Sequence, residues 1–257
     1  MMNGDGDTHA GGAPSARVDG DRLTHTGADE RARAAAAQAA VERCLRPGMT
    51  IGLGSGRAVA AVIDAVARRW PDGGGLRAVT ASPRTAELAA QAAVELIELD
   101  GRLRLDLAID GADEVDTHLD LLKGGGGALL REKIIAHAAA RFVVVAEETK
   151  LVRRLGARRA LPVEVVRFGW RQTRRRLLDL LPDAALRVDA AGEPLLTDEG
   201  HYILECPLPD TGDLRVLADA IKLVTGVVEH GLFLSTADEA FLGRRDGSIE
   251  VLRRTTE

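Results

Sequence analysis

The residue types best suited to chemistry lie in one stretch that begins at Asp110. It contains a second carboxylate at Asp113, a lysine at Lys123, four consecutive glycines at 124–127 and a glutamate at Glu132. An ordered glycine costs roughly 0.5–1 kcal/mol relative to alanine. A stable domain therefore keeps four in a row only where backbone N–H groups must come close to something, and we interpret the stretch as a site.

Two carboxylates next to a lysine suit proton transfer. The pKa of a crowded carboxylate rises, and an ammonium group stabilises negative charge that develops nearby. Glu114 and Asp116 add further negative charge, which could bind Mg²⁺ or Ca²⁺, but the spacing fits no known loop and Lys123 would oppose a cation. The alternative is a solvated acidic turn formed by Asp110, Asp113 and their neighbours.

Two further residues are candidate site residues because of their positions. Glu132 falls in an expected helix, where a glutamate can simply complement the helix dipole. It also follows Gly127 by five residues, so the glycine backbone that can bind an oxyanion would bring a carboxylate close. Lys150 follows the apolar run 142–146, at the C-terminal end of an expected strand, and a solvated lysine is the alternative there.

A second glycine turn lies upstream. Glycines occupy alternate positions of 52–56 between an apolar strand and a helix, and the free N–H groups of a helix N-terminus suit an anion. The dinucleotide fingerprint would need glycine where Arg57 stands and an acidic residue near 80–82. The turn therefore predicts a phosphate or small-anion cradle with Ser55 and Arg57 as donors. A tight strand-to-helix turn with no ligand is the alternative.

Periodicity predicts the elements that position these residues. Strands are expected over 49–53, 77–80, 94–99, 105–109 and 142–146, and helices over 29–45, 59–66, 83–92 and 128–140. Alternating strands and helices predict an α/β domain, doubly wound around a mostly parallel sheet, with its site at the C-terminal strand ends.

The pattern changes after residue 160. Strands are expected over 163–166, 186–188, 202–206, 240–243 and 248–252, and helices over 170–181 and 213–224. The β-α-β-β-α order favours a smaller ferredoxin-like α+β domain inserted near the C-terminus. The predicted division is a disordered tail over 1–28, a Rossmann-like catalytic domain over 29–160 with 230–257, and the small domain over 161–229.

Composition limits the class of protein. The 257 residues are 46% apolar and 28% charged with a net charge of −5, which is typical of a soluble globular protein and shows no footprint for nucleic acid. Arginines over 167–176 are interpreted as a solvated helix face. No apolar segment reaches the roughly 18 residues of a membrane span. Cys44 and Cys206 fit no metal or redox spacing, so we expect a reduced, cytoplasmic protein.

With these residues assembled, the chain resembles the A-type ribose-5-phosphate isomerase family over about residues 29–252. The motifs that carry the resemblance are Gly52-Leu-Gly-Ser-Gly56, Asp110-Gly-Ala-Asp-Glu114, Lys123 to Lys133, Lys150, Leu161-Pro-Val-Glu-Val165, Thr197-Asp-Glu-Gly200 and Gly226 to Phe233. The resemblance implies interconversion of ribose 5-phosphate and ribulose 5-phosphate through an enediolate. It also implies that no metal or organic cofactor is needed, and that the protein is a homodimer or homotetramer.

The resemblance assigns roles to individual residues. It makes Glu132 the base, Asp110 and Asp113 the paired aspartates and Lys123 the substrate lysine. The substrate-binding residues that it implies, together with the glycine turns, are Gly54, Ser55, Gly56, Arg57, Gly124, Gly125 and Lys150.

One departure from the family pattern falls in the phosphate cradle. Arg57-Ala58 replaces a common Ser-Thr pair, so two hydroxyl donors are missing. Arg57 either supplies a charge-assisted contact instead or alters the affinity or the preferred sugar phosphate. Two other classes stay open: a sugar-phosphate sensor that binds without turnover, and an isomerase or transferase for another sugar phosphate. The tail over 1–28 is too short for the DNA-binding module that such sensors carry.

Overall fold

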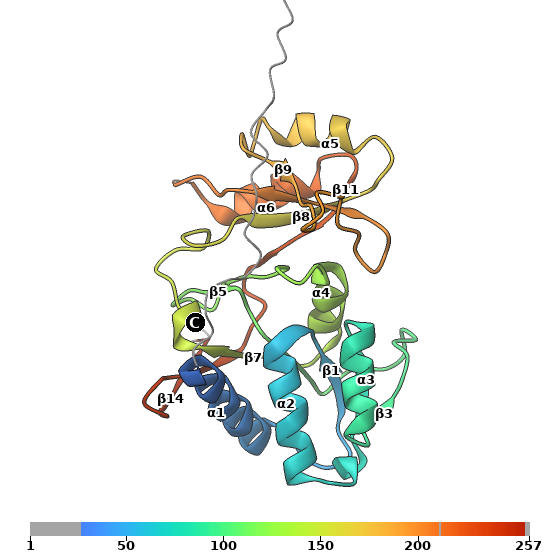
Figure 1. Ribbon diagram of the computed structural model, residues 1–257, viewed down its shortest axis with the longest axis vertical. Helices are drawn as coiled ribbons and strands as arrows, with labels where there is room; N and C mark the ends of the chain where they lie inside the picture. The colour runs from blue at the N-terminus through green and yellow to red at the C-terminus, as the bar shows by residue number, and fades with distance from the viewer. Residues whose placement is uncertain (1–26, 211, 255–257) are drawn as a thin grey trace, which may run out of the picture.

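The computed structural model describes residues 27–210 and 212–254. Over these residues the chain forms three β-sheets with flanking helices (Figure 1). The tail predicted over 1–28 lies outside the described residues except for Gly27 and Ala28, which begin the first helix instead. None of the described helices is long and apolar enough to cross a membrane.

The central sheet has seven strands. All neighbouring pairs are parallel except one, the pair that the most C-terminal strand forms with the strand next to it. In spatial order they are β14 (Ile249–Arg253), β13 (Glu239–Gly243), β7 (Phe142–Glu147), β4 (Leu107–Asp110), β1 (Thr50–Leu53), β2 (Arg77–Thr80) and β3 (Glu95–Leu96). This arrangement confirms the predicted mostly parallel sheet.

Helices cover both faces of the central sheet. One face packs against α1 (Gly27–Cys44), α2 (Gly56–Arg69) and α3 (Pro83–Gln91), which lie side by side in Figure 1. The other packs against α4 (Leu129–Ala138). Side chains alternate along a strand, so in β7 Val143 faces the first layer and Val144 the second. Burial on both faces explains why this strand is continuously apolar.

The second sheet is antiparallel, with the order β11 (Val227–His230), β8 (Leu161–Val165), β10 (Tyr202–Cys206) and β9 (Ala185–Leu186). Its helices are α5 (Trp170–Leu177) and α6 (Leu214–Lys222). The chain order β-α-β-β-α-β confirms the ferredoxin-like prediction, although β11 was missed. Figure 1 shows this layer above α4. The domain boundaries at 160/161 and 229/230 stay a prediction.

A third, small sheet joins the other two. Its strands are β12 (Leu232–Phe233), β6 (Leu121–Leu122) and β5 (Glu114–Val115), in that spatial order. Two-residue strands leave no periodicity in a sequence, so this sheet was not predicted. Val115, Leu121 and Phe233 pack into the core on the α4 side of the central sheet. The third sheet therefore positions the chain between Asp110 and the glycine run.

Several predicted strands and helices were longer than the observed ones. The strand expected over 94–99 pairs only at Glu95–Leu96, because it lies at the edge of the sheet and turns away near Asp100. The helix expected to reach 181 ends at Leu177 and continues as turns. Two short 3-10 helices, η1 (Gly73–Gly75) and η2 (Glu148–Lys150), lie in segments where no helix or strand was expected. The helix expected over 83–92 begins after Ser82, whose side chain accepts the N–H of Thr85.

Gly231 connects the ferredoxin-like layer to the stretch that carries the site. Its N–H donates to the carbonyl of Pro162 in β8, and its own carbonyl accepts the N–H of Lys123, both at 2.8 Å. A Cβ at Gly231 would lie 2.1 Å from the carbonyl oxygen of Lys123. Only glycine fits between these two backbones.

We therefore expect Gly231→Ala to destabilise the protein strongly. Because the clash is with backbone rather than with a flexible side chain, the free energy of unfolding should fall by about 2 kcal/mol or more. Gly247→Ala is the control, since its Cβ would meet nothing within 4 Å but φ is +88°, and it should cost about 1 kcal/mol. Urea unfolding measures both, and equal losses would contradict the role of Gly231.

Candidate active site

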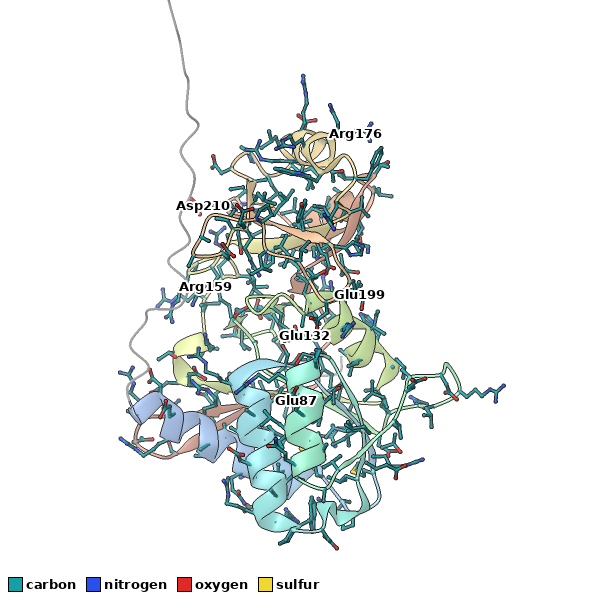
Figure 2. All side chains as sticks on the ribbon, turned by 45° about the vertical axis from the view of Figure 1, so that its right-hand side comes forward. Glu87, Glu132, Arg159, Arg176, Glu199 and Asp210 are labelled. Atoms are coloured by element: carbon teal, nitrogen blue, oxygen red, sulfur yellow. The ribbon has the colours of Figure 1, made fainter. Side chains whose placement is uncertain are left out.

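Lys123 lies at the centre of a buried charge cluster. Its Nζ is 2.8 Å from Asp110 Oδ2 and 3.2 Å from Glu132 Oε2, and it donates to the carbonyl of Gly111 at 2.7 Å. All three side chains are at most 5% exposed. Asp110 ends β4, Lys123 follows β6 and Glu132 lies in the first turn of α4, so three elements meet here. In Figure 2, Glu132 lies between the central sheet and the ferredoxin-like layer.

The cluster shifts the pKa values of its members. Burial, reinforced by the charge of Glu132, raises the pKa of Asp110 to about 7 even though Lys123 acts in the opposite direction. Burial alone would lower the pKa of Lys123, but the charges of Asp110 and Glu132 outweigh it and hold this pKa above its usual range. The lysine is therefore a fixed cation, and Asp110 can exchange a proton near neutral pH.

Asp113 joins the cluster through the glycine run. Its Oδ2 accepts the N–H of Gly125 at 2.7 Å, and a Cβ at Gly125 would lie 2.7 Å from the same carboxylate. Gly124 and Gly127 have φ values of +101° and +87°, in the region that favours glycine. The run is therefore needed both for its turn and for close approach to Asp113.

The first glycine turn supports the same cluster. A Cβ at Gly54 would lie 1.8 Å from Cγ of Asp110, so this glycine makes room for the carboxylate. The N–H of Ser55 donates to Asp110 Oδ1 at 3.1 Å, and its hydroxyl donates to Glu132 Oε1 at 2.5 Å. Ser55 stands at the N-cap of α2 but caps no N–H there. Its hydroxyl instead orients Glu132, a contact that the sequence did not reveal.

The remaining acidic residues of the turn have other partners. Glu114 is fully buried and accepts the N–H groups of Gly156, Arg158 and Arg159 at 2.6, 2.7 and 2.9 Å. Asp116 accepts two N–H groups of its own loop. Within 27–210 and 212–254, no group of three or more histidine, cysteine or acidic side chains is arranged to hold a metal ion.

Arg57 and Lys150 lie at the same edge of the central sheet but outside the cluster. Arg57 is exposed in the first turn of α2, directly after Gly56, whose φ is +79°. Lys150 ends η2, just beyond β7, and is half-buried. Among the described residues its side chain makes no hydrogen bond or ion pair, and its charge acts on Glu147. Because β1, β4 and β7 are neighbours, the residues that follow them converge on one edge.

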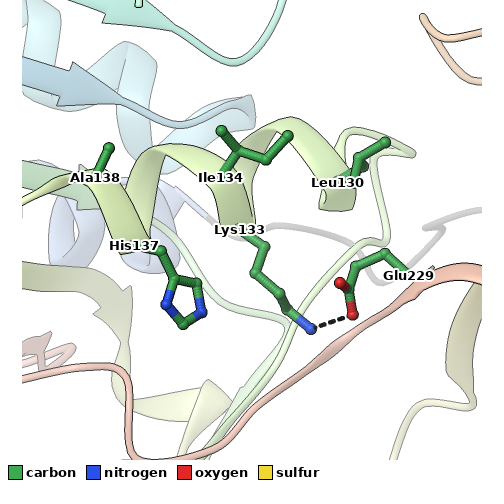
Figure 3. A pocket seen from close by; sticks show the side chains of 6 residues that line it. All are labelled: Leu130, Lys133, Ile134, His137, Ala138 and Glu229. Carbon is green, nitrogen blue, oxygen red and sulfur yellow. Dashed lines mark hydrogen bonds and ion pairs between the residues drawn. The ribbon is translucent and has the colours of Figure 1, made fainter. Parts of the chain in front are cut away.

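The sequence did not predict the supporting roles of two residues, Lys133 and Arg187. Lys133, next to Glu132 on α4, donates to Glu229 Oε1 at 2.8 Å (Figure 3). It also donates to the carbonyls of His230 and Leu232 at 2.7 and 2.9 Å. It holds the segment between β11 and β12 against α4. Arg187 reaches the glycine run from the ferredoxin-like sheet. Neither residue shows a spacing that would single it out in a sequence.

Comparison with known proteins decides the family. A model of ribose 5-phosphate isomerase A (phosphoriboisomerase A) matches residues 77–247. The chain belongs to the ribose 5-phosphate isomerase A family. Among similar members, ribose-5-phosphate isomerase A of Synechococcus sp. (strain JA-3-3Ab) is 46% identical over 86% of this chain and 96% of its own length. That of Roseiflexus castenholzii is 48% identical over 82% of this chain and 93% of its own length.

Solved structures of ribose-5-phosphate isomerases share the fold. One, a D-ribose-5-phosphate isomerase in complex with phospho-erythronic acid, has a TM-score of 0.83 and 32% identity, and the match covers 88% of this chain and 99% of that one. The enzyme from Plasmodium falciparum also has a TM-score of 0.83, with 30% identity over 88% of this chain and 100% of that one. These family members match over nearly their whole length.

Burial of Asp110 predicts that the stability of the fold depends on pH. The ordinary pKa of 3.8 rises to about 7 in the fold, so the folded state holds the proton more tightly and loses stability as the pH rises from about 4 to about 7. Asp110→Asn removes this titration together with the ion pair to Lys123. We expect the urea midpoint of the parent to fall from pH 5 to pH 8 by more than that of the variant.

The exposed Asp179→Asn serves as control and should change stability little at either pH. An equal fall from pH 5 to pH 8 in the parent and in Asp110→Asn would show that this carboxylate does not titrate in that range.

Proposed function

We propose that this chain interconverts D-ribose 5-phosphate and D-ribulose 5-phosphate, with Glu132 as the base. The observation that carries the assignment is Glu132 Oε2: it is buried beside Lys123 Nζ, and within the described residues it has no hydrogen-bond partner. A sugar-phosphate sensor and an isomerase for another sugar phosphate are not favoured, because relatives similar over most of their length are ribose-5-phosphate isomerases.

The proposed reaction moves one proton between C2 and C1 of the opened sugar. Glu132 Oε2 takes the proton from C2 and returns it to C1, while Ser55 holds the other oxygen of the carboxylate. Lys123 and the amides of 124–127 stabilise the enediolate oxygen. Asp110 and Asp113 help to open the ring and transfer hydroxyl protons. This role fits the pKa of Asp110, which is about 7.

We propose that the phosphate binds at the opposite end of the site. The side chain of Ser55 caps no N–H at the N-terminus of α2, a position that suits an anion, and Gly54 and Gly56 leave this turn without side chains. Arg57 and Lys150 add positive charge at the same edge of the sheet. Arg57 would replace the hydroxyl donors that the family commonly has here with a charge-assisted contact.

We propose that the protein is a cytoplasmic homodimer or homotetramer. Cys44 and Cys206 are both buried and unpaired, which suits a reducing compartment. The oligomeric state is the one that the resemblance to the A-type isomerases implies.

The Glu132→Gln variant tests the assignment of the base. The amide keeps the shape of the side chain but cannot accept a carbon-bound proton, so kcat should fall by at least about 10²–10⁴-fold while sugar phosphate still binds. Glu199→Gln is the matched control, because Glu199 lies on the surface in an ion pair with Arg131. Ketose formation from ribose 5-phosphate is the measurement. Near-normal turnover by Glu132→Gln would show that Glu132 is not the base.

The Lys150→Met variant tests the phosphate end. If Lys150 contacts the phosphate, losing one charge-assisted contact should raise KM by about 10–100-fold and leave kcat within a few-fold. Lys222→Met is the control, because Lys222 forms an ion pair with Glu229 outside the cluster. Steady-state kinetics with ribose 5-phosphate decide the question. An unchanged KM would remove Lys150 from the site.

A further inference from the structure

Arg187 reaches the glycine run from the ferredoxin-like sheet. It lies one residue beyond β9, and its N–H continues the ladder to the carbonyl of Ile203 in β10 at 2.8 Å. The residue is only 8% exposed. Its NH1 donates to the carbonyls of Gly124 and Gly125 at 3.0 and 3.2 Å, and its Nε and NH2 face Glu205. One guanidinium group therefore contacts a carboxylate and two backbone carbonyls at once.

These contacts fix two consecutive peptide units. In a planar trans peptide the C=O and N–H groups point in opposite directions. With the carbonyl of Gly124 held by Arg187, the N–H of Gly125 points away from it and donates to Asp113 at 2.7 Å. The carbonyl of Gly125 is held in the same way, so the N–H of Gly126 is also directed away from Arg187.

The N–H of Gly126 remains available to a substrate. Among the described residues it donates to no protein acceptor. The position faces the cluster, because a Cβ placed on Gly126 would lie 3.8 Å from Ser55 Oγ, the atom that holds Glu132. A positive group on the carbonyl side also polarises the peptide and strengthens its N–H as a donor.

We propose that Arg187 is a positioning residue of the isomerase reaction: it holds the two peptide units so that Gly125 orients Asp113 and Gly126 donates to the enediolate oxygen. The inference rests on the proposed roles of Asp113 and the glycine amides. Arginine suits the task because its planar fork can bind a carboxylate on one side and carbonyls on another, whereas lysine offers a single point charge.

Arg187→Met and Arg187→Lys test the proposal. Misplaced amides weaken stabilisation of the enediolate more than ground-state binding, so kcat of Arg187→Met should fall by about 10–100-fold while KM changes by less than about threefold. Affinity for phospho-erythronic acid, whose carboxylate resembles the reacting end, should fall with kcat. Arg187→Lys keeps the charge and one donor and should recover part of the loss.

Arg174→Met is the matched control, because Arg174 donates to a backbone carbonyl, that of Ala184, at 2.6 Å in the same layer but away from the site. It should lose stability without losing kcat. If Arg187→Met does not fold, Arg187→Lys and Glu205→Gln carry the test, since each loosens the guanidinium geometry while keeping a polar group. Unchanged kcat in the folded variants would overturn the proposal.

Glu132→Gln in the same assay separates this inference from the proposed function. If Glu132→Gln is inactive but the Arg187 variants keep full kcat, only the role of Arg187 is wrong. If Glu132→Gln itself retains activity, the proposed base is wrong.

Discussion

One buried ammonium between two buried carboxylates is the interaction on which the rest of the structure depends. Removing such charges from water costs several kcal/mol for each ion, and only close pairing and extra hydrogen bonds offset it. Lys123 provides the pairing with Asp110 and Glu132, and the carbonyl of Gly111 provides a further acceptor. The cluster still holds one more negative than positive charge, which is why burial leaves Asp110 ready to take up a proton near neutral pH.

This constraint explains why the protein brings three sheets together at one point. The central sheet delivers Asp110 and Ser55, the small third sheet delivers Lys123, and the ferredoxin-like sheet supports the glycine run through Arg187. Glycine occupies positions where segments from different strands approach closely, as at Gly54 beside Asp110 and Gly231 beside Lys123. The ferredoxin-like layer thus takes part in shaping the site as well as covering it.

Much of this could be predicted from the sequence, for identifiable reasons. The continuous apolar run at 142–146 already predicts a buried strand. Asp110, Lys123 and Glu132 stand out because charge beside bare backbone has little use in a core. The two-residue strands are too short to leave a periodic pattern. The bond from Ser55 to Glu132 and the contact of Arg187 with Gly124 could not be predicted, because each joins residues more than 60 positions apart. The contact of Lys150 with phosphate remains a prediction.

A crystal structure of this chain with phospho-erythronic acid bound would test most directly whether Lys123 and the glycine amides form the oxyanion site. The account predicts that the ligand's carboxylate lies about 3 Å from Lys123 Nζ and from the N–H of Gly126, with Glu132 beside its carbon chain. The phosphate should lie at the N-terminus of α2. A phosphate bound at Lys123 instead, with the carboxylate directed away from Glu132, would contradict the account.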